Sequence, residues 1–291
     1  MKKIYFILTL ILCHSLTMAQ PSKVSSQLSS KVSIASHRGD WRNYADNSLE
    51  GIESCIRMNI DLVEIDVAKT KDGHLVLMHD RKVDRTTNGK GLVSDFTLEE
   101  IKQLRLKNGL GRVTDFQIPT LEEVLQAVKD KIIVNIDKGD AYFDDVYRIL
   151  ETTGTINQAI IKSNKPYAQL REHYGENLDR MTFMPVVQLK KETTIDSISA
   201  VLDKKYPMYE ICFEEENKAL LLQIKEKLQG ASVIWINPLW DSLCGSYSDD
   251  RALQDPDGTW GYLIDELGAG ILQTDRPALM LEYLKKRNLH D

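Results

Sequence analysis

Short apolar runs alternate along this chain with segments whose apolar residues recur at helical spacing. The apolar runs predict strands at residues 32–35, 62–68, 75–78, 132–137, 159–162, 182–187, 209–213, 232–236 and 271–274. The helical patterns lie at residues 49–57, 121–128, 143–150, 166–174, 193–202, 218–228, 260–267 and 277–286. Strands that alternate with helices in this way pair in parallel through right-handed crossovers.

The run at 75–78 lies close to its predecessor, so the pattern contains eight strand-then-helix units. Eight such units predict an α/β protein with a (β/α)8 TIM barrel rather than an open doubly wound sheet. No glycine-rich dinucleotide fingerprint follows the first strand, which removes the usual cofactor argument for the open sheet. Two long connections break the alternation: a small insertion after the second strand, at residues 80–117, and residues 237–259. Both follow the carboxyl ends of strands, which is where barrel enzymes place their active sites.

The first residues are typical of a secretory signal peptide. Lys2 and Lys3 precede an apolar run at 4–12, and small residues at positions 17 and 19 predict cleavage after Ala19. An uncleaved anchor needs a longer apolar run, and Leu12 is too large to precede a lipidated Cys13. We therefore expect a signal peptide at 1–19, a flexible leader at 20–31, a barrel at 32–287, and a secreted or periplasmic protein without stable membrane insertion after cleavage.

Composition and charge indicate a folded domain and bear on its partners. The chain is 42% hydrophobic and 27% charged, as in folded soluble domains, with a net charge of −6 that removal of Lys2 and Lys3 would make two units more negative. This acidic balance disfavours nucleic acid as a partner. The cysteines outside the signal, Cys55, Cys212 and Cys244, are odd in number, so one stays free or pairs with another chain.

Candidate chemistry lies at the predicted strand ends. Glu64 and Asp66 are two residues apart in an apolar strand, so both carboxylates point into the barrel mouth. Two buried like charges need neutralising, either by a hard divalent cation such as Mg²⁺ or Ca²⁺ or by Lys or Arg side chains. Asp137, at the end of the 132–137 strand, is a plausible third carboxylate. His37 and His79 are candidate acid–base groups at strand ends, and Arg38 is suited to gripping a phosphate.

A series of motifs resembles the glycerophosphodiester phosphodiesterase family over roughly residues 32–287. The matching stretches are His37-Arg38-Gly39, Asn47-Ser48, Glu64-x-Asp66, Lys71-Asp72-Gly73, His79-Asp80, Asp84-Arg85-Thr86-Thr87-x-Gly89, Ile118-Pro119-Thr120-Leu121 and Thr274-Asp275-Arg276-Pro277. The resemblance implies a TIM barrel that hydrolyses phosphodiesters with a divalent cation. It implies His37 and His79 as the acid–base pair, Glu64 and Asp66 as metal ligands, and Arg38 on the phosphate.

The sequence departs from the family pattern at the third strand. Asp137 occupies the position of a metal-binding Glu, and Gly139 stands where a Lys is usual. Lys138 is adjacent but would point to the opposite face of a regular strand, so we favour Lys162 on the next strand as the replacement cation. The segments around Phe213 and from Trp235 to Trp240 differ from common members, which makes these three aromatic residues candidate walls of an altered substrate pocket.

The resulting hypothesis is a metal-dependent phosphodiesterase that releases glycerol phosphate and an alcohol from a small phosphodiester. The nucleophile is either a neighbouring substrate hydroxyl, which gives a cyclic phosphate, or water. Two alternatives are a barrel phospholipase acting on intact phosphatidylinositol- or sphingomyelin-type lipids and a non-catalytic binding barrel. The alcohol, the metal and the oligomeric state do not follow from the sequence.

Overall fold

Eight parallel strands close into a barrel in the computed structural model, which describes residue 24 and residues 32–291. In chain order they are β1 (Ser33–His37), β2 (Leu62–Lys69), β4 (Ile133–Asp137), β5 (Ala159–Ser163), β6 (Thr182–Leu189), β7 (Met208–Phe213), β8 (Val233–Ile236) and β9 (Ala269–Thr274). Each strand pairs with the next, and β9 pairs with β1 to close the ring. The TIM barrel predicted from the alternation is confirmed.

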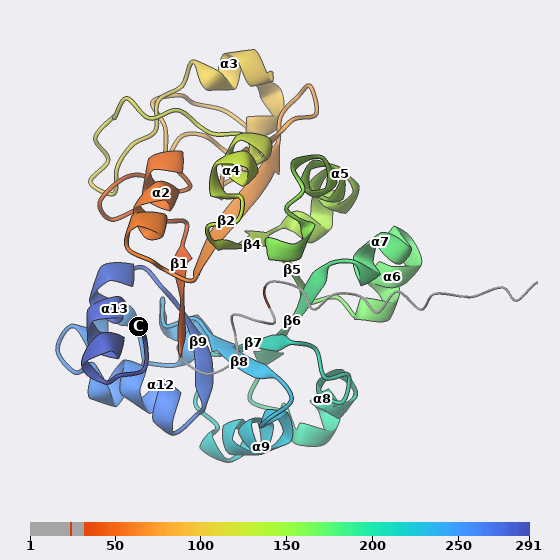
Figure 1. The fold of residues 1–291 in the computed structure, drawn as a ribbon, viewed down its shortest axis with the longest axis vertical. Helices are drawn as coiled ribbons and strands as arrows, with labels where there is room; N and C mark the ends of the chain where they lie inside the picture. The colour runs from red at the N-terminus through yellow and green to blue at the C-terminus, as the bar shows by residue number, and fades with distance from the viewer. Residues whose placement is uncertain (1–23, 25–31) are drawn as a thin grey trace, which may run out of the picture.

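Helices surround the strands on the outside of the ring (Figure 1). They are α2 (Leu49–Arg57), α4 (Leu121–Val128), α5 (Phe143–Thr153), α6 (Tyr167–Tyr174), α7 (Glu176–Asp179), α8 (Ile195–Leu202), α9 (Lys218–Leu228), α12 (Tyr262–Asp265) and α13 (Pro277–Lys286). Two short helices, α10 (Asp241–Cys244) and α11 (Asp249–Ala252), lie in the connection between β8 and β9. Several helices begin at a side chain that caps the free backbone N–H groups of the first turn. At the start of α4, the Thr120 side chain accepts from the Glu123 N–H, and the Glu123 side chain accepts from the Thr120 N–H. The predicted helix at 260–267 is shorter, because a π-helical turn, η4 (Asp257–Gly261), precedes α12.

The segment after β2 forms a small subdomain at one side of the barrel. Strand β3 (Leu75–Leu77) pairs antiparallel with β2, and the chain continues through η1 (Val93–Asp95) and α3 (Leu98–Lys102), at the top of Figure 1. Its buried apolar residues form a cluster separate from the main core, together with Ala45 from the loop between β1 and α2: Val76, Met78, Val83, Val93, Ile101, Leu106 and Ile118. The subdomain therefore has its own packing and can carry β3 and the following His79 to the barrel mouth.

The barrel interior has an apolar floor beneath a polar upper part. The floor consists of buried residues from all eight strands and from the leader: Val24, Ala35, Leu62, Ile133, Ile160, Met184, Met208, Trp235 and Ile271. Further along the same strands, the inward positions become polar and still buried, as at Glu64, Asn135 and Glu210. Outward-facing residues pack against the helices in the largest cluster. The polar chemistry is thus confined to the carboxyl ends of the strands.

Val24 lies in the segment that the sequence predicts as a flexible leader, yet its side chain is fully buried in the barrel floor. We expect Val24→Ala to lower the free energy of unfolding by about 1–2 kcal/mol, because a buried branched side chain would lose most of its packing. Urea unfolding of the purified variant measures this. Leu110→Ala, at a site that is 80% exposed, is the control and should change stability by less than about 0.5 kcal/mol; equal losses in both variants would contradict the packing role of Val24.

The remaining predictions for the N-terminus, the signal peptide at 1–19 and the rest of the leader, lie outside the described residues. Within residues 24 and 32–291, no helix is long and apolar enough to cross a membrane. Cys55, Cys212 and Cys244 are all buried free thiols.

Candidate active site

The predicted site residues from the first strands meet at the carboxyl end of the barrel because the strand register aligns them. His37 ends β1 and pairs in register with Glu64 on β2. Asp66 on β2 pairs in register with Asp137 at the end of β4. Alternation along the strands sends these side chains to the interior, so four residues separated by up to about a hundred positions share one mouth.

Glu64, Asp66 and Asp137 form a carboxylate triad in which one oxygen from each residue lies within 4.8 Å of the others. Burial, and then the charge of Asp66, raise the pKa of Glu64 well above its ordinary value. Burial also opposes the charge of Asp66, but Lys138 and Arg38 more than offset it and hold the pKa of Asp66 below its usual range. Burial and mutual repulsion thus oppose full ionisation of these carboxylates. A divalent cation, which prefers oxygen ligands, would stabilise their ionised forms.

Asn135 lies directly below this triad and gives a second test of whether a cation fits. It is fully buried and pairs in register with Glu64, yet neither its amide oxygen nor its amide nitrogen has a hydrogen-bond partner among the described residues. Orphaned buried amides are costly and usually indicate a partner such as bound water or an ion's hydration shell. The donor set and this unpartnered amide together fit a hydrated divalent cation.

Both candidate lysines reach the site, which corrects the expectation that Lys138 points away. The strand β4 ends at Asp137, and Lys138 takes a left-handed conformation with φ +60°. The regular alternation stops there, so the Lys138 ammonium turns inward and donates to Asp66 at 2.9 Å and to the backbone oxygen of His79 at 2.7 Å. Lys162 arrives from β5 and lies 3.5 Å from Asp137 and 3.2 Å from Glu210.

Lys162 is the more deeply enclosed of the two ammonium groups. Burial opposes its charge, but Glu210, Asp137 and Glu64 more than offset this and raise its pKa. We expect Lys162→Met to destabilise the fold by about 3–5 kcal/mol, because it leaves the buried carboxylate of Glu210 without its cationic partner. Urea unfolding measures the loss. Lys165→Met removes a more exposed pair with Asp140 and should cost no more than about 1 kcal/mol; a similarly small loss for Lys162→Met would contradict the burial argument.

Arg38 is held beside the triad by its backbone as well as its side chain. Its N–H donates to Glu64 at 3.1 Å, and φ at this residue is +55°. The guanidinium donates to Asp46 at 3.2 Å, and its Nε lies 3.3 Å from a carboxylate oxygen of Asp66. Asn47 fixes Asp66 from the other side, since it donates to the carboxylate and accepts from the Asp66 N–H, each at 3.0 Å. The predicted phosphate-binding arginine therefore lies against the predicted metal ligands.

Each candidate histidine has its Nδ1 fixed by a carboxylate. His37 Nδ1 lies 2.7 Å from Asp275, and the same carboxylate oxygen accepts from the indole N–H of Trp41 at 2.7 Å. Burial opposes ionisation of Asp275, but the bond with His37 and the other donors outweigh it and lower its pKa. An ionised carboxylate only accepts, so His37 Nδ1 carries the hydrogen, and Nε2 is left for proton transfer.

His79, which follows β3, has the same arrangement. Its Nδ1 lies 2.7 Å from Asp80, which is held by a two-point contact with Arg85. The hydrogen bonds from Arg85 lower the pKa of Asp80 to about 2, so this carboxylate is also an acceptor only. The predicted pair His37 and His79 thus consists of two oriented imidazoles with Nε2 free of these carboxylates.

Asp275, Glu210 and Asn237 belong to the site, although no role was predicted for them from the sequence. Glu210, on β7, accepts from Lys162 at 3.2 Å and from Asn237 at 2.9 Å, and it is 4% exposed. The sequence carried a signal for Glu210, because it is the single acidic residue of an otherwise apolar strand. Asp275 directly follows β9 within a matching motif, but its contact with His37 spans 238 residues and has no local signature.

Of the three predicted pocket aromatics, only Trp240 lies at an accessible position. It is 45% exposed, and its ring meets the His37 ring edge-on with centroids 5.7 Å apart. Phe213 has no exposed surface, because alternation along β7 turns it toward the outer layer, where it packs with Cys244. Trp235 is fully buried in the barrel floor and donates to Asn237 at 2.6 Å. Phe213 and Trp235 are therefore not walls of an open pocket.

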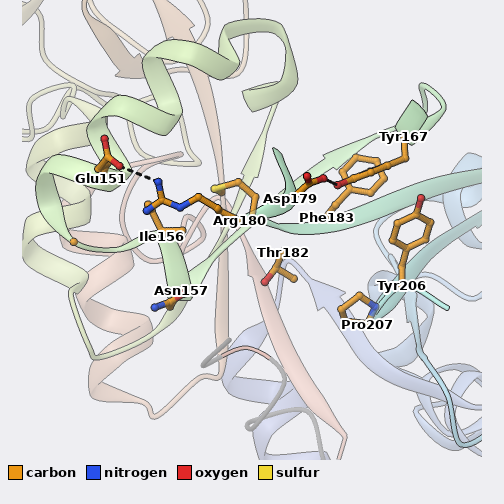
Figure 2. A pocket seen from close by; sticks show the side chains of 12 residues that line it. Glu151, Ile156, Asn157, Tyr167, Asp179, Arg180, Thr182, Phe183, Tyr206 and Pro207 are labelled. Carbon is orange, nitrogen blue, oxygen red and sulfur yellow. Dashed lines mark hydrogen bonds and ion pairs between the residues drawn. The ribbon is translucent and has the colours of Figure 1, made fainter. Parts of the chain in front are cut away.

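Figure 2 shows a hollow whose lining includes the start of β6. It has a volume of about 710 Å³ and is lined by residues that include Thr182 and Phe183, the first residues of β6. Arg180 reaches Glu151 at 3.1 Å across it, and the Tyr167 hydroxyl donates to Asp179 at 2.6 Å. These polar groups satisfy one another, and the amino ends of the strands are remote from the carboxylate triad. The hollow is separate from the candidate active site.

Comparison with known proteins divides the chain into two matching parts. Residues 37–171 match the glycerophosphoryl diester phosphodiesterase family, and residues 183–284 match a domain of unknown function, DUF4996. A glycerophosphodiester phosphodiesterase of Caldanaerobacter subterraneus is 46% identical over 109 residues, which cover 37% of this chain and 45% of the relative. One from Bacillus subtilis is 26% identical over 218 residues, covering 65% of this chain and 70% of the relative. The chain spans less than half the length of the first curated relatives that it matches.

Solved structures extend the likeness to the whole barrel. A glycerophosphoryl diester phosphodiesterase from Parabacteroides distasonis superposes with a TM-score of 0.73 at 24% identity, covering 89% of this chain and 87% of that one. A phosphodiesterase from Oleispira antarctica, in complex with the product sn-glycerol-3-phosphate, gives a TM-score of 0.64 at 16% identity over 90% of this chain and 99% of that one. At these identities the structures show a shared fold.

Proposed function

Because this chain belongs to the glycerophosphodiester phosphodiesterase family, we propose that it hydrolyses glycerophosphodiesters to glycerol phosphate and an alcohol. The observation that carries the proposal is the gathering of a carboxylate triad, three cationic side chains and two oriented histidines at one mouth. The relatives named for this activity, and the product bound to the Oleispira antarctica protein, support the same substrate class. A small phosphodiester is the proposed partner.

A divalent cation, Mg²⁺ or Ca²⁺, held by Glu64, Asp66 and Asp137 would neutralise part of the phosphoryl charge. Arg38, Lys138 and Lys162 surround the same position and would stabilise the negative charge that develops on the non-bridging oxygens. Because these groups are already fixed by buried partners, little reorganisation is needed during the reaction.

Proton transfer would fall to the two histidines. One Nε2 removes the proton from the nucleophile, and the other protonates the leaving alkoxide. Asp275 and Asp80 keep each ring in the tautomer that this requires, since each accepts from Nδ1. The nucleophile is either the neighbouring hydroxyl of the glycerol or water, and phosphorus NMR of the reaction separates them, because only the first route passes through a cyclic phosphate.

We also propose that the protein acts outside the cytoplasm, in the periplasm or as a secreted enzyme. The support is the charged start, the short apolar run and the small residues before Gln20. N-terminal sequencing of the protein purified from its secreted fraction tests this, and an N-terminus at Gln20 is expected. Retention of residues 1–19 on a cytoplasmic product would contradict it.

The activity is tested with purified protein on glycerophosphocholine and glycerophosphoinositol, and on intact phosphatidylinositol and sphingomyelin, each with and without EDTA. We expect release of glycerol phosphate from one or both water-soluble diesters, and loss of that release with EDTA. Cleavage of an intact lipid alone would favour a barrel phospholipase. Binding of a diester without turnover would favour a non-catalytic barrel.

A further inference from the structure

Asp249 is a buried acid of the long β8–β9 connection with no place in the mechanism above. It begins α11, is 1% exposed, and lies in the part of the chain that matches only a domain of unknown function. Within the part of the chain that the structure describes, no Lys, Arg or His side chain forms an ion pair with it. Burial raises its pKa to about 7. Such a group is costly to bury, so its contacts need an explanation.

Three hydrogen bonds hold the Asp249 carboxylate, and together they join separate parts of the chain. One oxygen accepts from the backbone N–H of Asp275 at 2.7 Å and from the hydroxyl of Thr274 at 2.8 Å. The other accepts from the indole N–H of Trp260 at 2.8 Å. The Asp249 N–H donates to the oxygen of Pro238 at 2.7 Å. Asp249 therefore links three segments through hydrogen bonds: the start of the β8–β9 connection, its π-helical turn and the end of β9.

The end of β9 is the segment that presents Asp275 to His37. The Asp275 carboxylate is occupied by His37 and Trp41, and its backbone oxygen accepts from Arg42 at 3.1 Å. Its backbone N–H is the remaining polar group, and Asp249 accepts from it. Thus Asp249 and Arg42 anchor the peptide groups on the two sides of the Asp275 Cα, while the side chain between them orients the imidazole.

We infer that Asp249 is a positioning residue for His37, which it fixes through the backbone of Asp275 without touching the substrate. The inference rests on the proposed function, because it assumes that His37 transfers a proton. It also gives the C-terminal half of the barrel a specific role, since the half that resembles a domain of unknown function sets the geometry of a histidine carried by the other half. A small displacement of a proton-transfer group is sufficient to lower the rate strongly.

Asp249→Ala tests this in the full-length mature protein, with the phosphodiester that the parent hydrolyses fastest. We expect kcat to fall about 10- to 100-fold, with KM changed by less than about twofold, because misorientation of His37 affects the transition state rather than substrate binding. Asp249→Asn should lose less, since its amide oxygen can still accept from Asp275 and Thr274 while the Trp260 contact is lost. It also provides the test if the alanine variant does not fold.

Asp255→Asn is the matched control, because Asp255 lies in the same connection and caps the N–H of Gly258 at 2.9 Å, away from β9. We expect its kcat to equal that of the parent. If Asp249→Ala folds with parental kcat, or if Asp249→Ala and Asp255→Asn lower kcat equally, the positioning role is overturned. Parental kcat in Asp249→Asn overturns it as well if the alanine variant is unfolded.

Histidine NMR gives a readout that does not depend on turnover. The His37 Nδ1 proton is protected in a short bond to Asp275, so it should give a downfield signal, assigned by its loss in His37→Ala. We expect the signal to shift or broaden in Asp249→Ala and to persist in Asp255→Asn. An unchanged signal in Asp249→Ala would overturn the inference. If the parent cleaves no diester tested, the proposed function fails, while this spectrum still decides whether Asp249 positions His37.

Discussion

His37→Ala is expected to lower kcat about 100- to 10,000-fold while leaving the fold intact. The magnitude is the typical contribution of one general acid or base. The variant should fold, because His37 is the last residue of β1 and the backbone pairing of β1 with β2 and β9 does not depend on the imidazole. Steady-state kinetics on the preferred diester, together with a thermal unfolding curve, measures both parts of the prediction.

His74→Ala is the control for a general effect of losing an imidazole, since His74 is largely exposed and lies in the turn between β2 and β3. We expect it to retain parental kcat. His79→Ala should resemble His37→Ala, because His79 has the corresponding carboxylate partner in Asp80. A His37→Ala variant with a rate close to the parent would remove His37 from the chemistry and with it the assignment of the site.

Glu64→Gln is expected to weaken binding of Mg²⁺ or Ca²⁺ by more than about 100-fold and to reduce activity in parallel. Loss of an outer partner of a metal ligand already costs about 10- to 100-fold in affinity, and a direct ligand should cost more. Because burial and Asp66 raise the pKa of Glu64, the cation must displace a proton from it, so affinity in the parent should increase as the pH rises. Isothermal titration calorimetry at several pH values measures both effects.

Glu53→Gln is the control for the cation experiment, since Glu53 is a half-exposed acid on the outer helix α2. It should bind the cation as the parent does, and EDTA should abolish parental activity. Cation affinity that is independent of pH and unchanged in Glu64→Gln would place the metal elsewhere. In that case the carboxylates of the triad would be neutralised by Arg38, Lys138 and Lys162 and not by a metal ion.

Local patterns predicted the fold and the acidic part of the site with little error. The alternation of strands and helices is a strong signal, and residues two apart in a strand share a face whatever the rest of the chain does. Glu64, Asp66 and Asp137 accordingly meet as expected. The position of Lys138 was wrong, because one left-handed residue after β4 reverses the direction of a side chain, and Lys has no sequence preference that reveals it.

Errors in the other half of the site have a different physical origin. Phe213 was assigned to the pocket because its segment differs from common family members, although alternation from Glu210 would have turned it outward. Asp275 and Asp249 act through contacts with residues far away in the chain, so no spacing rule connects them to His37. Local periodicity predicts which face a residue occupies, but it cannot predict which distant residue lies opposite.

The bond between His37 and Asp275 crosses the junction between the first and last strands of the ring. These partners are 238 residues apart, and β9 is completed only near the end of the chain. Contacts of such long separation form late, because the loop between them must close first. A nascent chain that has already gathered Glu64, Asp66 and Asp137 would therefore still lack an oriented His37. Catalytic competence should then appear only when the ring closes, so that enzymatic activity during refolding would follow closure of the junction rather than formation of the metal-binding half.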